Sequence, residues 1–202
     1  TVHKINEGAF NRCRNLTKID IDDDSELISI GKESFSYTLI SELKITSKVE
    51  ELCEGWCINT MKLNKIILSP ENKNFKYLNE KIIIGKSDPE NEVFDSIVFA
   101  CRDITDVYIP SFIHYICSYA FSGCKKLTKV TFQENSELIS IGDYAFSTST
   151  IGPISIPVHV NKIGEFAFYG CKNLKKVEFS ENSELKSINK KAFSWSSLES
   201  IT

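Results

Sequence analysis

One short pattern of apolar and polar positions, apolar-x-x-apolar-x-apolar, recurs eight times along the chain. The copies lie at residues 16–21, 40–45, 63–68, 104–109, 127–132, 151–156, 174–179 and 198–202. In six of the seven complete copies one polar residue separates the last two apolar positions, which is the alternation of a strand with one buried face; the copy at 63–68 has Ile67 there. The pattern therefore predicts eight short β-strands, each with one face exposed to solvent.

A second pattern lies between the strands and ends on a large aromatic residue, as in IGDYAF and IGEFAF. Its last residue, which we call the anchor, is found at Phe10, Phe35, Phe121, Phe146, Phe168 and Phe193. Neighbouring anchors are 25 or 22 residues apart, and these spacings place two further anchors at Cys57 and Phe99. The last two are separated by 42 residues, which is 17 more than 25. The chain therefore reads as eight coils with an insertion between the third and the fourth.

Strands this short cannot bury an apolar face alone. Stacked coils bury it together and pair their backbones as a parallel ladder. The anchors then line the interior, and we expect Phe10, Phe99 and Phe168 to lie in a single interior column. The segments that carry the anchors form the opposite wall, where we expect short 3-10 or strand-like pieces instead of long helices.

The insertion occupies about residues 70–95 and does not follow the repeat. KYL and KIIIG flank Asn79-Glu80, and SDPEN is a strong turn signal, so we expect a two-stranded flap or an enlarged loop. Long loops on repeat scaffolds often bind partners. The insertion is therefore either a tolerated surface loop or an element of binding or assembly.

The phrase IPVHVNKIGEFAFYGCKNLKKVEF, residues 156–179, resembles the BspA-like class of leucine-rich repeats, with its pattern I-P-x-x-V-x-x-I-G-x-x-A-F-x-x-C-x-x-L. The resemblance covers nearly the whole chain and is weakest over residues 70–100. It implies an α/β-type repeat: a right-handed leucine-rich-repeat solenoid of about eight coils with short parallel β-strands, a 3-10 or irregular opposite wall and little α-helix. Residues 1–202 then form one solenoid, and because the chain begins and ends inside the pattern we expect a fragment of a longer protein.

Members of this class resemble surface proteins of bacteria and of some parasitic protists. The resemblance implies adhesion or recognition of a protein or glycan on another cell or in a matrix, at the cell surface or after secretion, without catalysis. A formal net charge of −3 argues against a broad nucleic-acid surface, and no apolar run is long enough to span a bilayer. The seven cysteines favour a reducing compartment, so a cytoplasmic location stays open as an alternative.

The cysteines are expected to be structural. Cys13, Cys124 and Cys171 share one repeat position, where they should stack as small buried hydrophobic side chains. Coils that alternate in the stack lie about 9 to 10 Å apart, too far for a disulfide, although one that involves Cys101 stays open because the insertion breaks the register. Cys53 and Cys57 form a lone C-x3-C without further zinc ligands nearby.

No motif indicates catalysis, a cofactor or a metal site. His3, His114 and His159 fall in different coils and are expected at the surface. The acidic runs DIDDDSE and EFSENSE lack the glycine-centred loop of a calcium site. Asn15-Leu16-Thr17 is a sequon for N-glycosylation, and its use is left open.

The outward positions of the predicted strands form the largest organised surface, and a partner-binding face on an open solenoid would use them. They are Thr17, Lys18, Asp20, Ser41, Glu42, Lys44, Asn64, Lys65, Thr105, Asp106, Tyr108, Thr128, Lys129, Thr131, Lys175, Lys176 and Glu178. The face is polar and mixed in charge, with Tyr108 as its one aromatic residue. The alternative is a solvated face on a passive spacer or surface antigen, and the oligomeric state is left open.

Overall fold

The computed structural model describes all 202 residues and consists of seventeen strands joined by turns, without a helix. One side, the wall, is formed by β1 (Lys4–Ile5), β2 (Ser29–Ile30), β4 (Glu51–Leu52), β8 (Ser96–Ala100), β10 (Tyr115–Ile116), β12 (Ser140–Ile141), β14 (Lys162–Ile163) and β16 (Ser187–Ile188). The opposite side, the strand face, is formed by β3 (Glu42–Ile45), β5 (Lys65–Leu68), β9 (Asp106–Ile109), β11 (Lys129–Phe132), β13 (Ile154–Ile156), β15 (Lys176–Phe179) and β17 (Ser200–Ile201). The insertion contributes a hairpin, β6 (Phe75–Asn79) and β7 (Ile82–Gly85).

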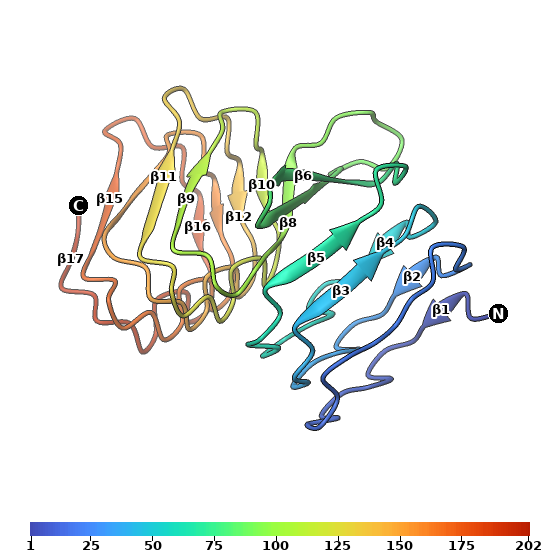
Figure 1. Ribbon diagram of the computed structural model, residues 1–202. Coiled ribbons are helices and arrows are strands. Elements are labelled where there is room, and N and C mark those ends of the chain that lie inside the picture. The colour runs from blue at the N-terminus through green and yellow to red at the C-terminus, as the bar shows by residue number, and fades with distance from the viewer.

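Most successive coils pair in parallel, on the wall and on the strand face, which confirms the predicted solenoid (Figure 1). Seven of the eight predicted face strands are present. The segment 16–21 is not a strand, although Leu16, Ile19 and Ile21 still pack against the core. Its coil is the first in the stack and has a neighbour on one side only.

The wall consists of short strand-like pieces, one of the two forms that we expected, joined by turns and without a 3-10 helix. Seven coils each carry two residues with left-handed backbone, two positions before and two positions after the anchor. These pairs are Gly8 and Arg12, Glu33 and Tyr37, Gly55 and Asn59, Tyr119 and Gly123, Tyr144 and Thr148, Phe166 and Gly170, and Lys191 and Trp195. Alternate N–H groups along the wall donate to the next coil, as Phe146 N does to Ala167 O at 2.8 Å and Thr148 N to Tyr169 O at 2.6 Å.

The interior holds two clusters of buried apolar side chains, with 15 residues in the N-terminal half and 29 in the C-terminal half. In the C-terminal half the anchors stack face to face, with Phe121 and Phe146 4.9 Å apart and Phe146 and Phe168 5.3 Å apart. Phe99 instead packs on Trp56 at 5.4 Å in the N-terminal cluster. The prediction of a single interior column was therefore wrong, because two separate aromatic stacks fill the core.

The fourth coil causes this division because its wall segment is short. Only 10 residues separate Ile97 on the wall from Val107 on the strand face, whereas 14 separate the equivalent Ile116 and Val130 (107 − 97 and 130 − 116). This coil lacks the left-handed pair, and Ala100 N donates to Ala120 O at 3.0 Å, as anchors do in other coils. Phe99 is therefore not the fourth anchor.

Arg102 fills the space of the missing turn. Its guanidinium is buried, with 4% of the residue exposed, and one of its nitrogens donates to Ala100 O and Ala120 O at 3.2 Å each. The group lies over the Phe99 ring at 4.6 Å and also contacts the Cys57 thiol at 3.3 Å. Burial raises the pKa of Cys57 to about 11, so the thiol stays neutral near pH 7. The Arg102 cation is therefore stabilised by the two carbonyl groups and by the face of the Phe99 ring.

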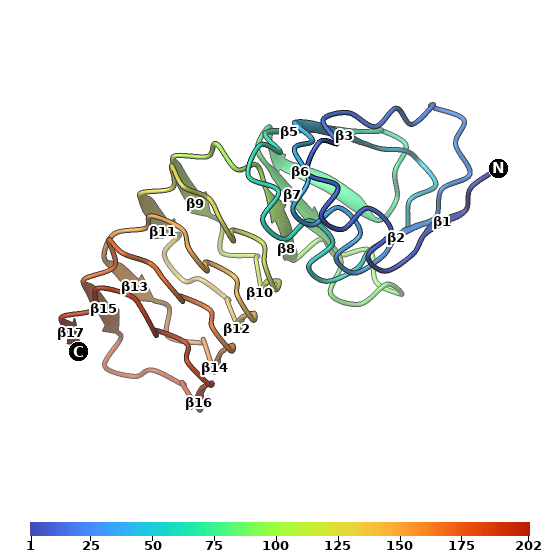
Figure 2. The ribbon, with the colours of Figure 1, turned by 90° about the horizontal axis from the view of Figure 1, so that it is seen from below.

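The hairpin is part of the core, not a surface flap. Ile82 and Ile84 belong to the C-terminal cluster, and Ile83 belongs to the N-terminal cluster. Tyr77 joins the hairpin to β5, because its hydroxyl donates to Ile66 O at 2.6 Å and accepts from Leu68 N at 3.0 Å. The hairpin thus stands between the two halves, and β3 and β5 run at an angle to β9 and β11 (Figure 1). Figure 2 shows the N-terminal coils turned away from the direction in which the C-terminal coils stack.

All seven cysteines are free, so the disulfide left open for Cys101 does not form. Cys124 and Cys171 are buried as predicted. Cys13, in the first coil of residues 1–202, is exposed, contrary to prediction.

Candidate functional site

The outward residues of the strand face lie where the alternating pattern placed them. In β9 the residues alternate between exposed and buried, which presents Asp106 and Tyr108 to solvent. All of the predicted partner-binding residues are exposed or half-exposed. They come from different coils, however, and the structure does not make one continuous sheet of them.

The strand face is divided into three sheets: β3–β5, β9–β11 and β13–β15–β17. The hairpin separates the first two. A proline separates the other two. The residue after β11, Gln133, donates its N–H to Ile109 O at the end of β9 at 2.9 Å, whereas the residue after β13 is Pro157. Proline has no N–H to donate to Phe132.

A groove of about 510 Å³ opens where β11 and β13 part, and we call it the face groove. Lys129 and Thr131 line it from β11, and Ser155 lines it from β13. Phe132, half-buried, contributes the only ring. The prediction from sequence included Lys129 and Thr131 but missed Phe132, Ser155 and the groove itself. The two prolines of GPISIP were the signal for it.

Charged residues on both flanks of the strand face are paired within the chain. Lys65 contacts Glu42 at 3.3 Å across β3 and β5, and Lys175 contacts Glu199 at 3.1 Å. Lys18–Asp20, Lys44–Asp23 and Lys176–Glu178 are also ion pairs. Hydrogen bonds from Lys176 and Ser155 lower the pKa of Glu178. The flanks therefore present charges that already have partners.

At the centre of the strand face, charged side chains are not paired with one another as they are on the flanks. Lys129 lies opposite Asp106 in the ladder, and Thr131 lies opposite Tyr108. Neither Lys129 nor Asp106 belongs to an ion pair, because Thr105 Oγ1 donates to the Asp106 carboxylate at 2.8 Å and the lysine extends into the groove region. Tyr108 is 56% exposed. We call Asp106, Tyr108, Lys129 and Thr131 the central patch, and it combines an uncompensated cation, a carboxylate and an exposed ring beside the face groove.

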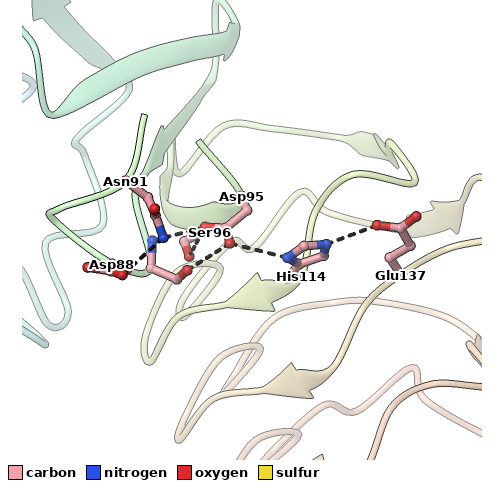
Figure 3. Close-up of polar contacts among 7 residues, drawn as sticks. Asp88, Asn91, Asp95, Ser96, His114 and Glu137 are labelled. Atoms are coloured by element: carbon pink, nitrogen blue, oxygen red, sulfur yellow. Dashed lines mark hydrogen bonds and ion pairs between the residues drawn. The ribbon is translucent and has the colours of Figure 1, made fainter. Parts of the chain in front are cut away.

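A second polar cluster lies on the wall and includes one of the predicted surface histidines (Figure 3). His114 is half-buried, with Nδ1 3.2 Å from Asp95 and Nε2 3.0 Å from Glu137. Asp95 also accepts from Ser87 N at 2.9 Å, Ser87 Oγ at 2.7 Å and Ser96 Oγ at 3.0 Å. Burial alone would raise the pKa of Asp95, but these hydrogen bonds together hold it below its usual value.

This cluster fastens a segment instead of forming a catalytic relay. Both nitrogens of His114 face carboxylates, and no serine or cysteine side chain lies on the ring as a nucleophile. Asp95 ends the segment that follows the hairpin, so the network holds residues 86–95 against the fifth and sixth coils. Elsewhere, no group of three or more His, Cys, Asp and Glu side chains is placed to hold a metal ion. The chain also has no helix with the length and apolarity to cross a bilayer.

Solved structures with a similar fold include leucine-rich proteins of bacteria. A leucine-rich cell surface protein of Faecalibacterium prausnitzii superimposes with a TM-score of 0.74 at 20% identity, over 99% of this chain and 57% of that one. A leucine-rich repeat protein of Eubacterium ventriosum gives a TM-score of 0.64 at 26% identity, over 77% of this chain and 40% of that one. The pneumococcal vaccine antigen PcpA gives 0.69 at 16% identity, over 90% and 49%.

The chain therefore spans 40% to 57% of the length of these three proteins. No curated protein sequence matches it significantly. Six copies of the BspA type leucine rich repeat region match residues 1–82 and 92–202, and the residues left out, 83–91, fall within the insertion. Because the match covers almost the whole chain, the protein belongs to the BspA-type leucine-rich repeat family.

Proposed function

We propose that this chain is a non-catalytic recognition module that binds a protein or glycan partner through the central patch and the face groove. The observation that carries the proposal is the contrast along the strand face. Lysines on the flanks are neutralised by neighbouring carboxylates, whereas Lys129 has no ion-pair partner and lies diagonally across the β9–β11 ladder from Tyr108, whose ring is exposed. A free cation beside an exposed aromatic side chain is typical of binding surfaces.

Two of the known structures with this fold are a cell surface protein and a vaccine antigen. This supports a location at the cell surface or outside the cell for the whole protein. The partner would then lie on another cell or in a matrix, and we do not expect a nucleic acid or direct insertion into a membrane. Affinity would come from several weak contacts, because the patch has one aromatic residue and no arginine.

The test is a binding screen of the purified chain against a glycan array and immobilised fibronectin, laminin and collagen. We expect saturable binding to at least one of these surfaces. Lys129→Glu and Tyr108→Ala should each weaken it about tenfold or more, as the loss of a hot-spot contact does. Lys175→Glu is the matched control, because it reverses a charge that is already paired and should change binding less than about twofold.

Two outcomes would favour the alternative, a passive spacer or surface antigen. One is the absence of saturable binding to every surface in the screen. The other is unchanged binding by Lys129→Glu, Tyr108→Ala and Lys175→Glu, which would show that the strand face is not the binding surface.

A further inference from the structure

A second pocket lies on the wall, on the opposite side of the solenoid from the strand face. It exists because the fourth coil lacks a wall turn. Gly55 of the third coil and Tyr119 of the fifth coil hold equivalent left-handed positions, and the shortened coil places no such residue between them. We call the space between these two coils the wall pocket, which has a volume of about 220 Å³.

The lining of the wall pocket is mostly apolar and aromatic. Trp56 and Phe99 are almost fully buried and form its floor, and Leu52 and Val98 lie at the sides. Tyr119 stands at the C-terminal edge, where it begins a stack with Tyr144 at 4.9 Å. Sites for drug-sized ligands are usually about 300 to 1,000 Å³, so this pocket suits a single side chain.

The rim of the wall pocket is acidic. Glu54 lines it, is exposed and belongs to no ion pair. Burial raises the pKa of Tyr119 to about 12, and Glu54, Glu33 and Asp143 act in the same direction on that ring. Glu33 and Asp143 are likewise absent from the ion pairs, and Lys32 on the neighbouring coil pairs with none of the three. Of the three, only Glu54 lines the pocket.

The three thiols of the pocket add no charge, and burial raises the pKa of Cys57 to about 11. Burial raises the pKa of Cys117 to about 12, and burial together with Glu51 raises that of Cys53. All three groups therefore stay neutral near pH 7. The pocket combines an aromatic lining with one carboxylate, Glu54, at its mouth, and the buried Arg102 guanidinium lies behind it against Phe99 and Cys57.

We propose that the wall pocket binds a lysine or arginine side chain presented by a partner protein. Such a side chain has an apolar stem for the floor and a cationic head for the rim, where Glu54 and the Tyr119 ring both attract positive charge. An uncharged side chain would fill the interior and leave the Glu54 carboxylate without a partner. The wall pocket is independent of the strand face, so either surface can engage a partner without the other.

The chain offers its own reporter for this test. It has two tryptophans, and Trp56 is in the floor of the pocket whereas Trp195 is exposed in the last coil. In the full chain carrying Trp195→Phe, the fluorescence of Trp56 can be followed during titration with capped lysine, capped arginine and capped norleucine. Norleucine has the apolar stem of lysine without the ammonium group.

We expect saturable changes with at least one basic probe at millimolar concentration, and at least about fivefold weaker binding of norleucine. Glu54→Gln should weaken the basic probe about fivefold, and added salt should act in the same direction. Glu50→Gln is the matched control, since it removes an exposed carboxylate that does not line the pocket. Lys129→Glu, on the strand face, should leave probe binding unchanged.

The proposal is overturned if neither basic probe gives a saturable change, or if norleucine binds as tightly as lysine. It also fails if Glu54→Gln and Glu50→Gln have equal effects. Because Glu54 is exposed and forms no internal ion pair, its replacement should not unfold the chain, and a thermal unfolding curve checks this.

Discussion

Left-handed backbone at side-chain-bearing residues is the most unusual feature at the residue scale. Thr148 has a φ of 56°, although its branched Cβ disfavours this region strongly. Its coil-to-coil bond from Thr148 N to Tyr169 O requires the conformation. The equivalent position one coil later is Gly170, with a φ of 69°. The same backbone thus accepts glycine without strain and threonine with strain.

Thr148→Gly should therefore stabilise the protein. We expect the free energy of unfolding to rise by about 1 kcal/mol, since left-handed backbone costs roughly 1–2 kcal/mol for an ordinary residue and glycine returns part of this through its freedom when unfolded. Urea denaturation measures the change. Thr150→Gly serves as the comparison and should destabilise, because Thr150 Oγ1 donates to Lys125 O and Leu127 O. A loss of stability in Thr148→Gly would contradict the strain argument.

The segment after the hairpin shows how one carboxylate fixes an element. Asp95 is almost fully buried, accepts four side-chain and backbone contacts, and has a pKa below its usual value. A carboxyl group whose pKa is lowered by folding stabilises the protein fully above its unfolded pKa of about 3.9. That contribution is lost as the pH falls through the lower, folded pKa.

Asp95→Asn should consequently cost about 1–3 kcal/mol at pH 7 and less near pH 2, because the contribution of the carboxylate is lost as the pH falls through its lowered pKa. Urea denaturation at the two pH values gives the difference. Glu90→Gln, an exposed carboxylate of the same segment, should change stability little at either pH. An equal cost of Asp95→Asn at both pH values would show that the carboxylate charge does not hold the segment.

Periodicity predicted the coils, the wall and the face strands well, since apolar spacing decides which residues a stacked repeat can bury. It failed at the fourth coil because IVFAC contains a phenylalanine near the expected position. A signal against it was present: five residues separate Ile116 from Phe121, whereas only two separate Ile97 from Phe99. The chain cannot close a full wall turn in two residues.

The candidate site was less accessible from sequence. Lys129 and Lys175 belong to equivalent repeat segments, LTKVTF and LKKVEF, one position apart, and sequence alone gives them equal weight. Only the placement of their neighbours separates them, because Glu199 reaches Lys175 whereas Asp106 is held by Thr105. The wall pocket exists because the fourth coil has no wall turn, and a repeat pattern does not show the space that an absent turn leaves between its neighbours.

At the scale of the whole molecule, the two apolar clusters predict unequal stability. The N-terminal cluster has 15 buried residues and the C-terminal cluster has 29, and the hairpin stands between them. In solenoids, stability is roughly a sum over coils and their interfaces, so the smaller cluster should open at lower free energy.

Native-state hydrogen exchange can compare two equivalent amides, Phe35 N, which donates to Trp56 O, and Phe146 N, which donates to Ala167 O. We expect the Phe146 amide to exchange at least about tenfold more slowly, a difference of about 1.4 kcal/mol in opening free energy. Equal protection at the two positions would mean that the solenoid opens as one cooperative unit.

The shortened fourth coil has a consequence for longer arrays of these repeats. Together with the hairpin it forms a bend between two stacks of coils, and the residues of the bend set its angle. Gain or loss of ordinary coils on either side would lengthen or shorten one stack and leave the bend unaltered. Reach and direction could therefore change independently during the evolution of such a protein.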